Sequence, residues 1–209
     1  MKVLVINGSP RANGNTATAI GQMTNIFEKH GIDTEVVQIG TMTIRGCQSC
    51  GYCYKNGKCV IDDVVNELAA KLEEADGFVI ASPVYFAGPN GTLVACLDRL
   101  CYSARFDKTM KVGAAVAVAR RGGTTATLDV LNKYLTYGGF AVATSQYWNL
   151  AHGKRPGEAI EDEEGMQTMR TLAENMVFLM KSIALGKEAY GLPEKEVRVG
   201  TDFIRKPKA

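Results

Sequence analysis

Two patterns of apolar and polar residues alternate along the 209-residue chain. Short apolar, β-branched runs recur about every 35 to 40 residues, and the stretches between them carry apolar residues at helical spacing. We predict strands at residues 2–7, 34–39, 77–81, 112–118 and 140–147. We predict helices at residues 15 to about 31, about 64 to 72, 91–105, 123–137 and 166–184, with Asp62 and Asp63 placed to cap the second.

This strict alternation predicts an α/β fold, a doubly wound parallel sheet of five strands in the flavodoxin-like order 2-1-3-4-5. The length and the 46% apolar composition suit one domain, which we place at residues 1–186. We expect the glycine-rich, charged stretch 151–164 to be an exposed excursion. Residues 187–209 show little periodicity, so we expect a C-terminal tail packed on the domain or on a neighbouring subunit.

Charge and the first residues argue against two classes of partner. The chain has 24 Lys and Arg against 22 Asp and Glu, a formal charge of +2 that is spread along the sequence, so nucleic acid is not the expected partner. The apolar run from Val3 to Ile6 is too short for a signal peptide or a membrane span. We expect a cytoplasmic protein that does not enter a membrane.

The segment from Gly8 to Thr16 has the features of an anion-binding loop. It follows the first strand, and Asn15 and Thr16 begin a helix whose first amides have no partner within the helix. Ser9, Arg11, Asn15 and Thr16 add side-chain donors suited to a phosphate. The loop is neither a P-loop nor a G-x-G-x-x-G fingerprint. In the alternative interpretation Ser9 and Asn15 only cap the helix, and Arg11 is a solvated charge.

The loop GSPR followed by GNT resembles the first loop of the flavodoxin-like family of NAD(P)H-dependent FMN reductases. The segment from Ala81 to Phe86 also matches the SPVY segment of that family. The resemblance covers almost the whole chain up to the last helix. It implies that Ser9, Arg11, Asn15 and Thr16 grip the FMN phosphate. It also implies that a second set flanks the isoalloxazine ring: Pro83, Val84, Tyr85 and Phe86.

Physical chemistry supports this placement, because such sheets bind ligands at the carboxyl ends of their strands, near the switch point between the first and third strands. Tyr85 and Phe86 offer flat apolar surface, although both could instead be ordinary core residues. The loop after the fourth strand supplies a further wall, since Gly122 and Gly123 let the backbone approach a ligand closely. Arg120 either joins that wall or is a plain surface charge.

Four of the six cysteines form the compact pattern C-x2-C-x2-C-x5-C: Cys47, Cys50, Cys53 and Cys59. The segment follows the second strand, so we expect it at the same sheet edge as the flavin. The spacing favours a [4Fe-4S] cluster over redox-active thiols, and zinc fits less well because it usually takes two separated thiolate pairs. The motif resembles the iron-sulfur flavoproteins, a branch of the same family that carries FMN and a [4Fe-4S] cluster.

We therefore expect an FMN-dependent oxidoreductase in which a cluster passes single electrons and FMN stores one or two. It would link a one-electron donor such as ferredoxin to a small-molecule acceptor, and no side chain is nominated as acid, base or nucleophile. The alternatives are an NAD(P)H-dependent FMN or quinone reductase without a cluster, and a non-enzymatic flavodoxin-like carrier or thiol redox sensor. We expect a homodimer or homotetramer in which the cysteine loop of one subunit approaches the FMN of its neighbour.

Overall fold

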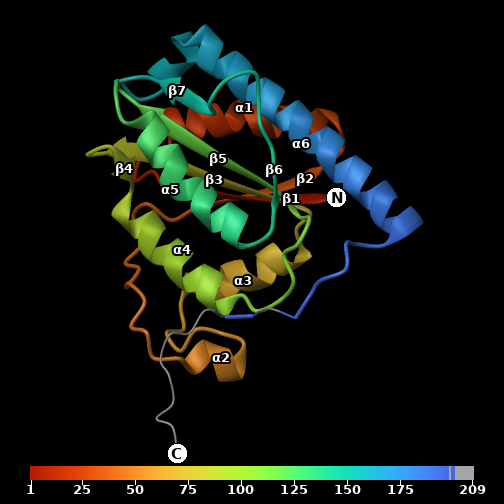
Figure 1. Cartoon of the computed structure of the whole chain (residues 1–209). Coiled ribbons are helices and arrows are strands. Elements are labelled where there is room, and N and C mark those ends of the chain that lie inside the picture. The colour runs from red at the N-terminus through yellow and green to blue at the C-terminus, as the bar shows by residue number, and fades with distance from the viewer. Residues whose placement is uncertain (198, 201–209) are drawn as a thin grey trace, which may run out of the picture.

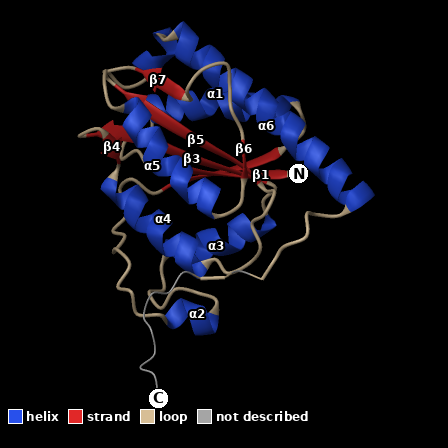
Figure 2. Cartoon of the chain, in the orientation of Figure 1, coloured by secondary structure: helices blue, strands red, loops and turns tan. Residues whose placement is uncertain are grey.

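A parallel sheet lies between two layers of helices in the computed structural model, which describes residues 1–197, 199 and 200 (Figures 1 and 2). The hydrogen-bonded strand order is β2-β1-β3-β5-β6, with β4 paired to β3 and β7 paired to β5. The strands are β1 (Lys2–Asn7), β2 (Asp33–Gln38), β3 (Gly77–Tyr85), β4 (Gly88–Pro89), β5 (Val112–Ala119), β6 (Ala141–Val142) and β7 (Leu150–His152). The main path confirms the predicted flavodoxin-like class and order, and β4 and β7 are additions to it.

The central strands are apolar because both of their faces are buried. In β1, Val3 and Val5 belong to one core cluster, and Leu4 and Ile6 belong to the other. Successive side chains of a strand point to opposite faces, so a continuous apolar run supplies both cores. The register aligns Val5 with Val79 of β3, which places the carboxyl ends of the two strands at one edge.

Different helices cover the two faces of the sheet. The first core cluster packs against α1 (Asn15–Lys29) and α6 (Glu163–Tyr190). The second packs against α3 (Val64–Glu74), α4 (Gly91–Ser103) and α5 (Thr124–Tyr137). Figure 1 shows the two layers on opposite sides of the sheet, with the short α2 (Tyr52–Asn56) below α3. Sequence periodicity did not predict α2 or the 3-10 helix η1 (Glu158–Glu161).

The predicted fifth strand at residues 140–147 is wrong in its extent. β6 pairs only with the start of β5, and β7 pairs with the end of β5 through Ala151 and its neighbours. Between them the chain leaves the sheet, because the Ser145 hydroxyl donates to the Tyr147 carbonyl at 2.7 Å and closes a local polar turn. The expected excursion at 151–164 is also wrong in part, since Ala151 and Ala159 are fully buried.

The last helix is longer than predicted. α6 continues to Tyr190, so the expected boundary at residue 186 falls inside it. Beyond the helix, Lys195 forms an ion pair with Asp107 of the same chain. The rest of the predicted tail, residues 198 and 201–209, lies outside the described residues. Among the described helices, none combines the length and hydrophobicity needed to cross a membrane.

Candidate functional site

Three strand-end loops meet at the carboxyl edge of the sheet. The loop after β1 is joined to β3 by a hydrogen bond from the Gly8 amide to the Ala81 carbonyl, at 2.9 Å. The loop after β5 packs on the turn that follows β3, since a Cβ placed at Gly123 would lie 2.7 Å from the Ala87 Cα. The structure therefore brings together the three segments from which the sequence predicted a flavin site.

Ser9 is hydrogen-bonded within the loop after β1 and fixes its conformation. The buried Ser9 amide donates to Asn7 Oδ1 at 2.9 Å, and its Oγ accepts from the Arg11 amide at 3.1 Å. The Arg11 side chain is exposed and has no ion-pair partner among the described residues. A rigid turn thus presents one uncommitted guanidinium at the edge of the sheet.

The start of α1 offers the backbone donors expected of an anion site. Gly14 is its N-cap and supplies no side-chain oxygen, and no acidic residue lies in the first turn. The first amides therefore lack an intrahelical partner, and the buried Thr16 lies among them. Asn15 is partly committed elsewhere, because its Oδ1 accepts from the Ala159 amide at 3.0 Å. The start of the helix therefore fits a phosphate. The side-chain Oδ1 of Asn15 does not face that site, because it is hydrogen-bonded to η1.

Gly40 supports the same loop and was missed by the sequence reasoning. A Cβ at Gly40 would lie 2.2 Å from the carbonyl carbon of Ser9, so only glycine allows this approach. The Gln38 amide also donates to the Ser9 carbonyl oxygen at 3.1 Å. The available signal was a glycine just after a strand, which often marks a close backbone approach.

The segment after β3 forms a tight hairpin with β4. Its two turn residues, Phe86 and Ala87, have φ values of 49° and 59°, in the left-handed region that a two-residue hairpin turn demands and that bulky residues rarely adopt. Phe86 is fully exposed, Tyr85 is about half exposed, and Pro83 and Val84 are partly buried. Neither aromatic residue is an ordinary core residue in this chain.

The loop after β5 is open and is supported from β7. Arg120 and Gly122 are exposed, and a Cβ at Gly122 would meet open space. Gly123 has a φ of 95° and is the N-cap of α5. His152 at the end of β7 contacts the Arg121 carbonyl through Nε2 at 3.1 Å. This loop leaves backbone groups accessible beside the hairpin, as a flavin edge would require.

The four clustered cysteines are free thiols that line one cavity of about 120 Å³. Ser49 and Gly51 on either side of Cys50 are left-handed, and the Ser49 amide approaches Cys47 Sγ at 3.5 Å. Left-handed residues are a component of the backbone nests that turn successive amides toward an anion, as in many iron-sulfur sites. The donor chemistry and the loop conformation therefore fit a thiolate-bound cluster.

The position of these thiols differs from the prediction. The segment leaves the sheet at the expected edge and then runs away from the sheet to α2 (Figure 1). Arg99, Tyr102 and Ser103 of α4 also line the cavity of the four thiols. Residues of the three flavin loops do not line this cavity. Within residues 1–197, 199 and 200, no three His, Cys, Asp or Glu side chains are gathered closely enough to hold a metal ion.

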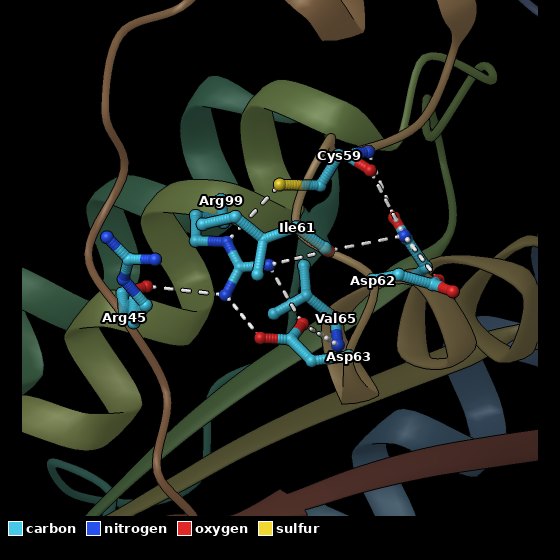
Figure 3. Close-up of polar contacts among 8 residues, drawn as sticks. Arg45, Cys59, Ile61, Asp62, Asp63, Val65 and Arg99 are labelled. Atoms are coloured by element: carbon cyan, nitrogen blue, oxygen red, sulfur yellow. Dashed lines mark hydrogen bonds and ion pairs between the residues drawn. The ribbon is translucent and has the colours of Figure 1, made fainter.

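Arg99 joins this cavity to the body of the protein (Figure 3). Its buried guanidinium donates from Nε to Cys59 Sγ at 3.3 Å, and from Nη1 and Nη2 to the Asp63 carboxylate at 2.7 and 2.8 Å. It also donates to the carbonyls of Arg45 and Ile61. Sequence reasoning missed Arg99, whose only signal was a charge on the otherwise apolar face of a helix.

Asn66 fixes the backbone of Cys59. Its Oδ1 accepts from the Cys59 amide at 2.9 Å, and its Nδ2 donates to the Cys59 carbonyl at 3.1 Å. The fourth cysteine is therefore held by α3 through its backbone and by α4 through its sulfur. Outside the cysteine motif, burial raises the pKa of Cys96 to about 12 and of Cys101 to about 11.

Residues 1–155 match the family described as NADPH-dependent FMN reductase. An iron-sulfur flavoprotein of Methanocaldococcus jannaschii is 35% identical over 191 residues, which is 88% of this chain and 99% of that protein. An iron-sulfur flavoprotein of Methanosarcina thermophila is 31% identical over 193 residues, covering 90% of this chain and 100% of that protein.

Solved structures share the fold at lower sequence identity. RosB with bound 8-demethyl-8-formylriboflavin-5'-phosphate has a TM-score of 0.66 at 20% identity, and the match covers 99% of this chain and 95% of that one. A flavodoxin from the domain Archaea has a TM-score of 0.58 at 16% identity, covering 87% and 99%. These likenesses confirm the flavodoxin-like architecture.

Proposed function

The chain belongs to the NADPH-dependent FMN reductase family and is a flavin-dependent oxidoreductase, and from this premise we propose that it is a two-centre electron-transfer enzyme. In this proposal FMN is held at the carboxyl edge of the sheet, and Cys47, Cys50, Cys53 and Cys59 hold a [4Fe-4S] cluster. The cluster supplies one-electron transfer, and FMN supplies the conversion between one- and two-electron chemistry.

The observation that carries the proposal is the cysteine cavity. Four free thiols line it, left-handed residues flank Cys50, and the fourth thiol is already hydrogen-bonded to a buried cation. Such donors stabilise the negative charge of a thiolate-bound cluster. The similar proteins named iron-sulfur flavoproteins give independent support.

The three strand-end loops carry the flavin half of the proposal. Arg11, Thr16 and the first amides of α1 would bind the phosphate, and Ser9 would hold the loop in shape. The hairpin residues Pro83 to Phe86 would flank the ring. The backbone from Arg120 to Gly123 would hydrogen-bond the ring edge and exclude water there.

The proposed reaction needs an electron donor and an electron acceptor. A ferredoxin-like protein or a nicotinamide nucleotide would supply electrons, and a small molecule would accept them. Because the cysteine cavity lies against α4 rather than beside the phosphate loop, electrons would pass most directly to the FMN of a second subunit in a homodimer or homotetramer.

A specific observation favours one alternative, an NAD(P)H-dependent FMN or quinone reductase with no cluster. The described thiols are not drawn together into a set able to hold a metal ion. In that enzyme hydride would pass directly to the flavin, and the cysteines would stay as free thiols.

Cofactor content of protein purified without oxygen tests the proposal. We expect about one FMN, about four irons and about four acid-labile sulfides per chain. Cys50→Ala should lose most of the iron and keep FMN, whereas Cys101→Ala should keep both, because that thiol is outside the loop. FMN with no iron in the wild type, before and after anaerobic reconstitution, would instead favour the cluster-free reductase.

A further inference from the structure

Two side chains of α4 form a polar wall of the cysteine cavity. Arg99 and Ser103 both line it, and each is 1% exposed. They are four residues apart on the helix, so they lie on the same face in consecutive turns. Buried polar groups of this kind are normally hydrogen-bonded, which makes their partners informative.

Arg99 has a fixed orientation toward sulfur. The Asp63 carboxylate and the carbonyls of Ile61 and Arg45 hold its two terminal nitrogens (Figure 3). Its Nε donates to Cys59 Sγ at 3.3 Å. Because a guanidinium remains charged in proteins, Nε is a charged donor that cannot turn away from the cavity, while the Asp63 carboxylate balances the net charge of the pair on its other side.

Ser103 supplies an independent observation. Its Oγ is buried and has no hydrogen-bond partner among the described residues. A buried hydroxyl without a partner is unfavourable, and in a native protein such a group is explained by strain, by a redox or catalytic role, or by a water, an ion or a ligand that completes it. The residue lines the same cavity as the four thiols, so a group bound among those thiols could supply the missing partner.

We propose that Arg99 and Ser103 are hydrogen-bond donors to the sulfur atoms of the [4Fe-4S] cluster, and that together they raise its reduction potential. The inference rests on the proposed cluster and extends it to residues outside the cysteine motif. Reduction adds one electron and hence one negative charge to the cluster, so oriented N–H and O–H donors stabilise the reduced form more than the oxidised form. Arg99 is also a positioning residue, since it holds the Cys59 sulfur.

Ser103→Ala is the most discriminating variant. In protein stripped of iron, it should leave thermal stability unchanged or raise it, because the hydroxyl bonds nothing there. In the loaded protein, the ratio of reduced to oxidised cluster at a fixed ambient potential should fall on the order of fivefold. The FMN couple should not move. Ser182→Ala, on the exposed side of α6, should change none of these quantities.

Arg99 is tested by a graded pair. Arg99→Lys keeps the charge and Arg99→Gln removes it, so the fall in that ratio should be larger for Arg99→Gln. Arg170→Gln on α6 is the matched control, since it removes a remote exposed guanidinium. If Arg99→Gln does not fold, the cluster potential of Ser103→Ala alone tests the proposal.

Two failures can be told apart. A wild-type protein that takes up no iron under anaerobic reconstitution would overturn the proposed cluster, and this inference with it. A wild-type protein that carries the cluster, together with a Ser103→Ala variant of unchanged cluster potential, would overturn this inference alone.

Discussion

Asp63 lies between Cys59 and α3 and is the N-cap of that helix, and its carboxylate binds both the start of α3 and Arg99 of α4. Oδ1 accepts the capping hydrogen bond from the Val65 amide at 3.1 Å, and both oxygens accept from Arg99. Burial alone would raise the pKa of the Asp63 carboxyl, but the hydrogen bonds from Arg99 and Val65 outweigh it and leave the pKa below its ordinary value. At the scale of single residues, this pair connects the candidate cluster to the fold.

Asp63→Asn should lower the free energy of unfolding by about 2–4 kcal/mol, because Arg99 would stay charged and buried without its carboxylate. Asp62→Asn, at the exposed neighbouring position, should cost less than about 0.5 kcal/mol. Urea denaturation measures both. Equal losses in the two variants would contradict the assigned role.

The same pair predicts the response to acid. A carboxylate with a depressed folded-state pKa contributes stability that is complete above its unfolded pKa of about 4 and is lost as pH falls through the folded pKa. Between about pH 5 and pH 2, wild-type protein should therefore lose more stability than Asp63→Asn. Parallel pH profiles for the two proteins would refute the charged pair.

A single added Cβ at Gly123 tests whether the loop after β5 contacts the flavin. Gly123→Ala places a Cβ in a left-handed residue and against Ala87, so it should lower stability by about 1–3 kcal/mol and weaken FMN retention. Gly122→Ala meets open space, so its stability should stay within about 0.5 kcal/mol of the wild type. Denaturation and the FMN content of purified protein provide the measurements.

At the scale of elements, the β3–β4 hairpin is the least ordinary connection. Its two-residue turn requires left-handed backbone at both positions, yet the residues there are Phe86 and Ala87 rather than the usual Asn and Gly. The Gly123 loop packs directly on this turn. The hairpin therefore keeps a strained shape at the expected flavin ring.

Ala87→Gly should relieve part of that strain. We expect a gain of about 0.5–1 kcal/mol in the free energy of unfolding, since glycine adopts a positive φ without a Cβ clash. Ala12→Gly, in an exposed turn without a positive φ, should be neutral or destabilising. Thermal denaturation of the pair checks this, and a loss of stability in Ala87→Gly would contradict it.

Elements buried on both faces could be predicted from the sequence. The range predicted for β1 matches, and β5 differs by one residue, because their apolar runs have no competing pattern. β6 lies within the strand predicted at 140–147, but its early end and the separate strand β7 could not be predicted, since local hydrogen bonds of Ser145 interrupt the ladder. The cysteine spacing predicted the four thiols of the cavity. Arg99 and Gly40 act through contacts distant in sequence, and the nearby contact of Asn66 with Cys59 depends on the path of the loop between them, which no periodic pattern describes.

At the scale of the whole molecule, the two candidate centres occupy different parts of one domain. The flavin loops lie at the carboxyl edge of the sheet, while the cysteine cavity lies against α4 in the layer that also contains α3 (Figure 1). This separation is why the proposed electron path leads to a second subunit.

The Lys195–Asp107 pair should not be needed for this arrangement. It lowers the pKa of Asp107 to about 2 but is half exposed on both sides. Lys195→Ala should therefore cost less than about 1 kcal/mol and leave the sedimentation coefficient of the assembly nearly unchanged. Dissociation of the Lys195→Ala protein would assign this pair to a subunit interface.

The central claim, two redox centres in one chain, is tested most directly by counting electrons. Anaerobic reductive titration of purified holoprotein, followed by absorbance, should require about three electron equivalents per chain, two for FMN and one for the cluster. Cys50→Ala should require about two. An endpoint of two equivalents in the wild-type protein would contradict the account.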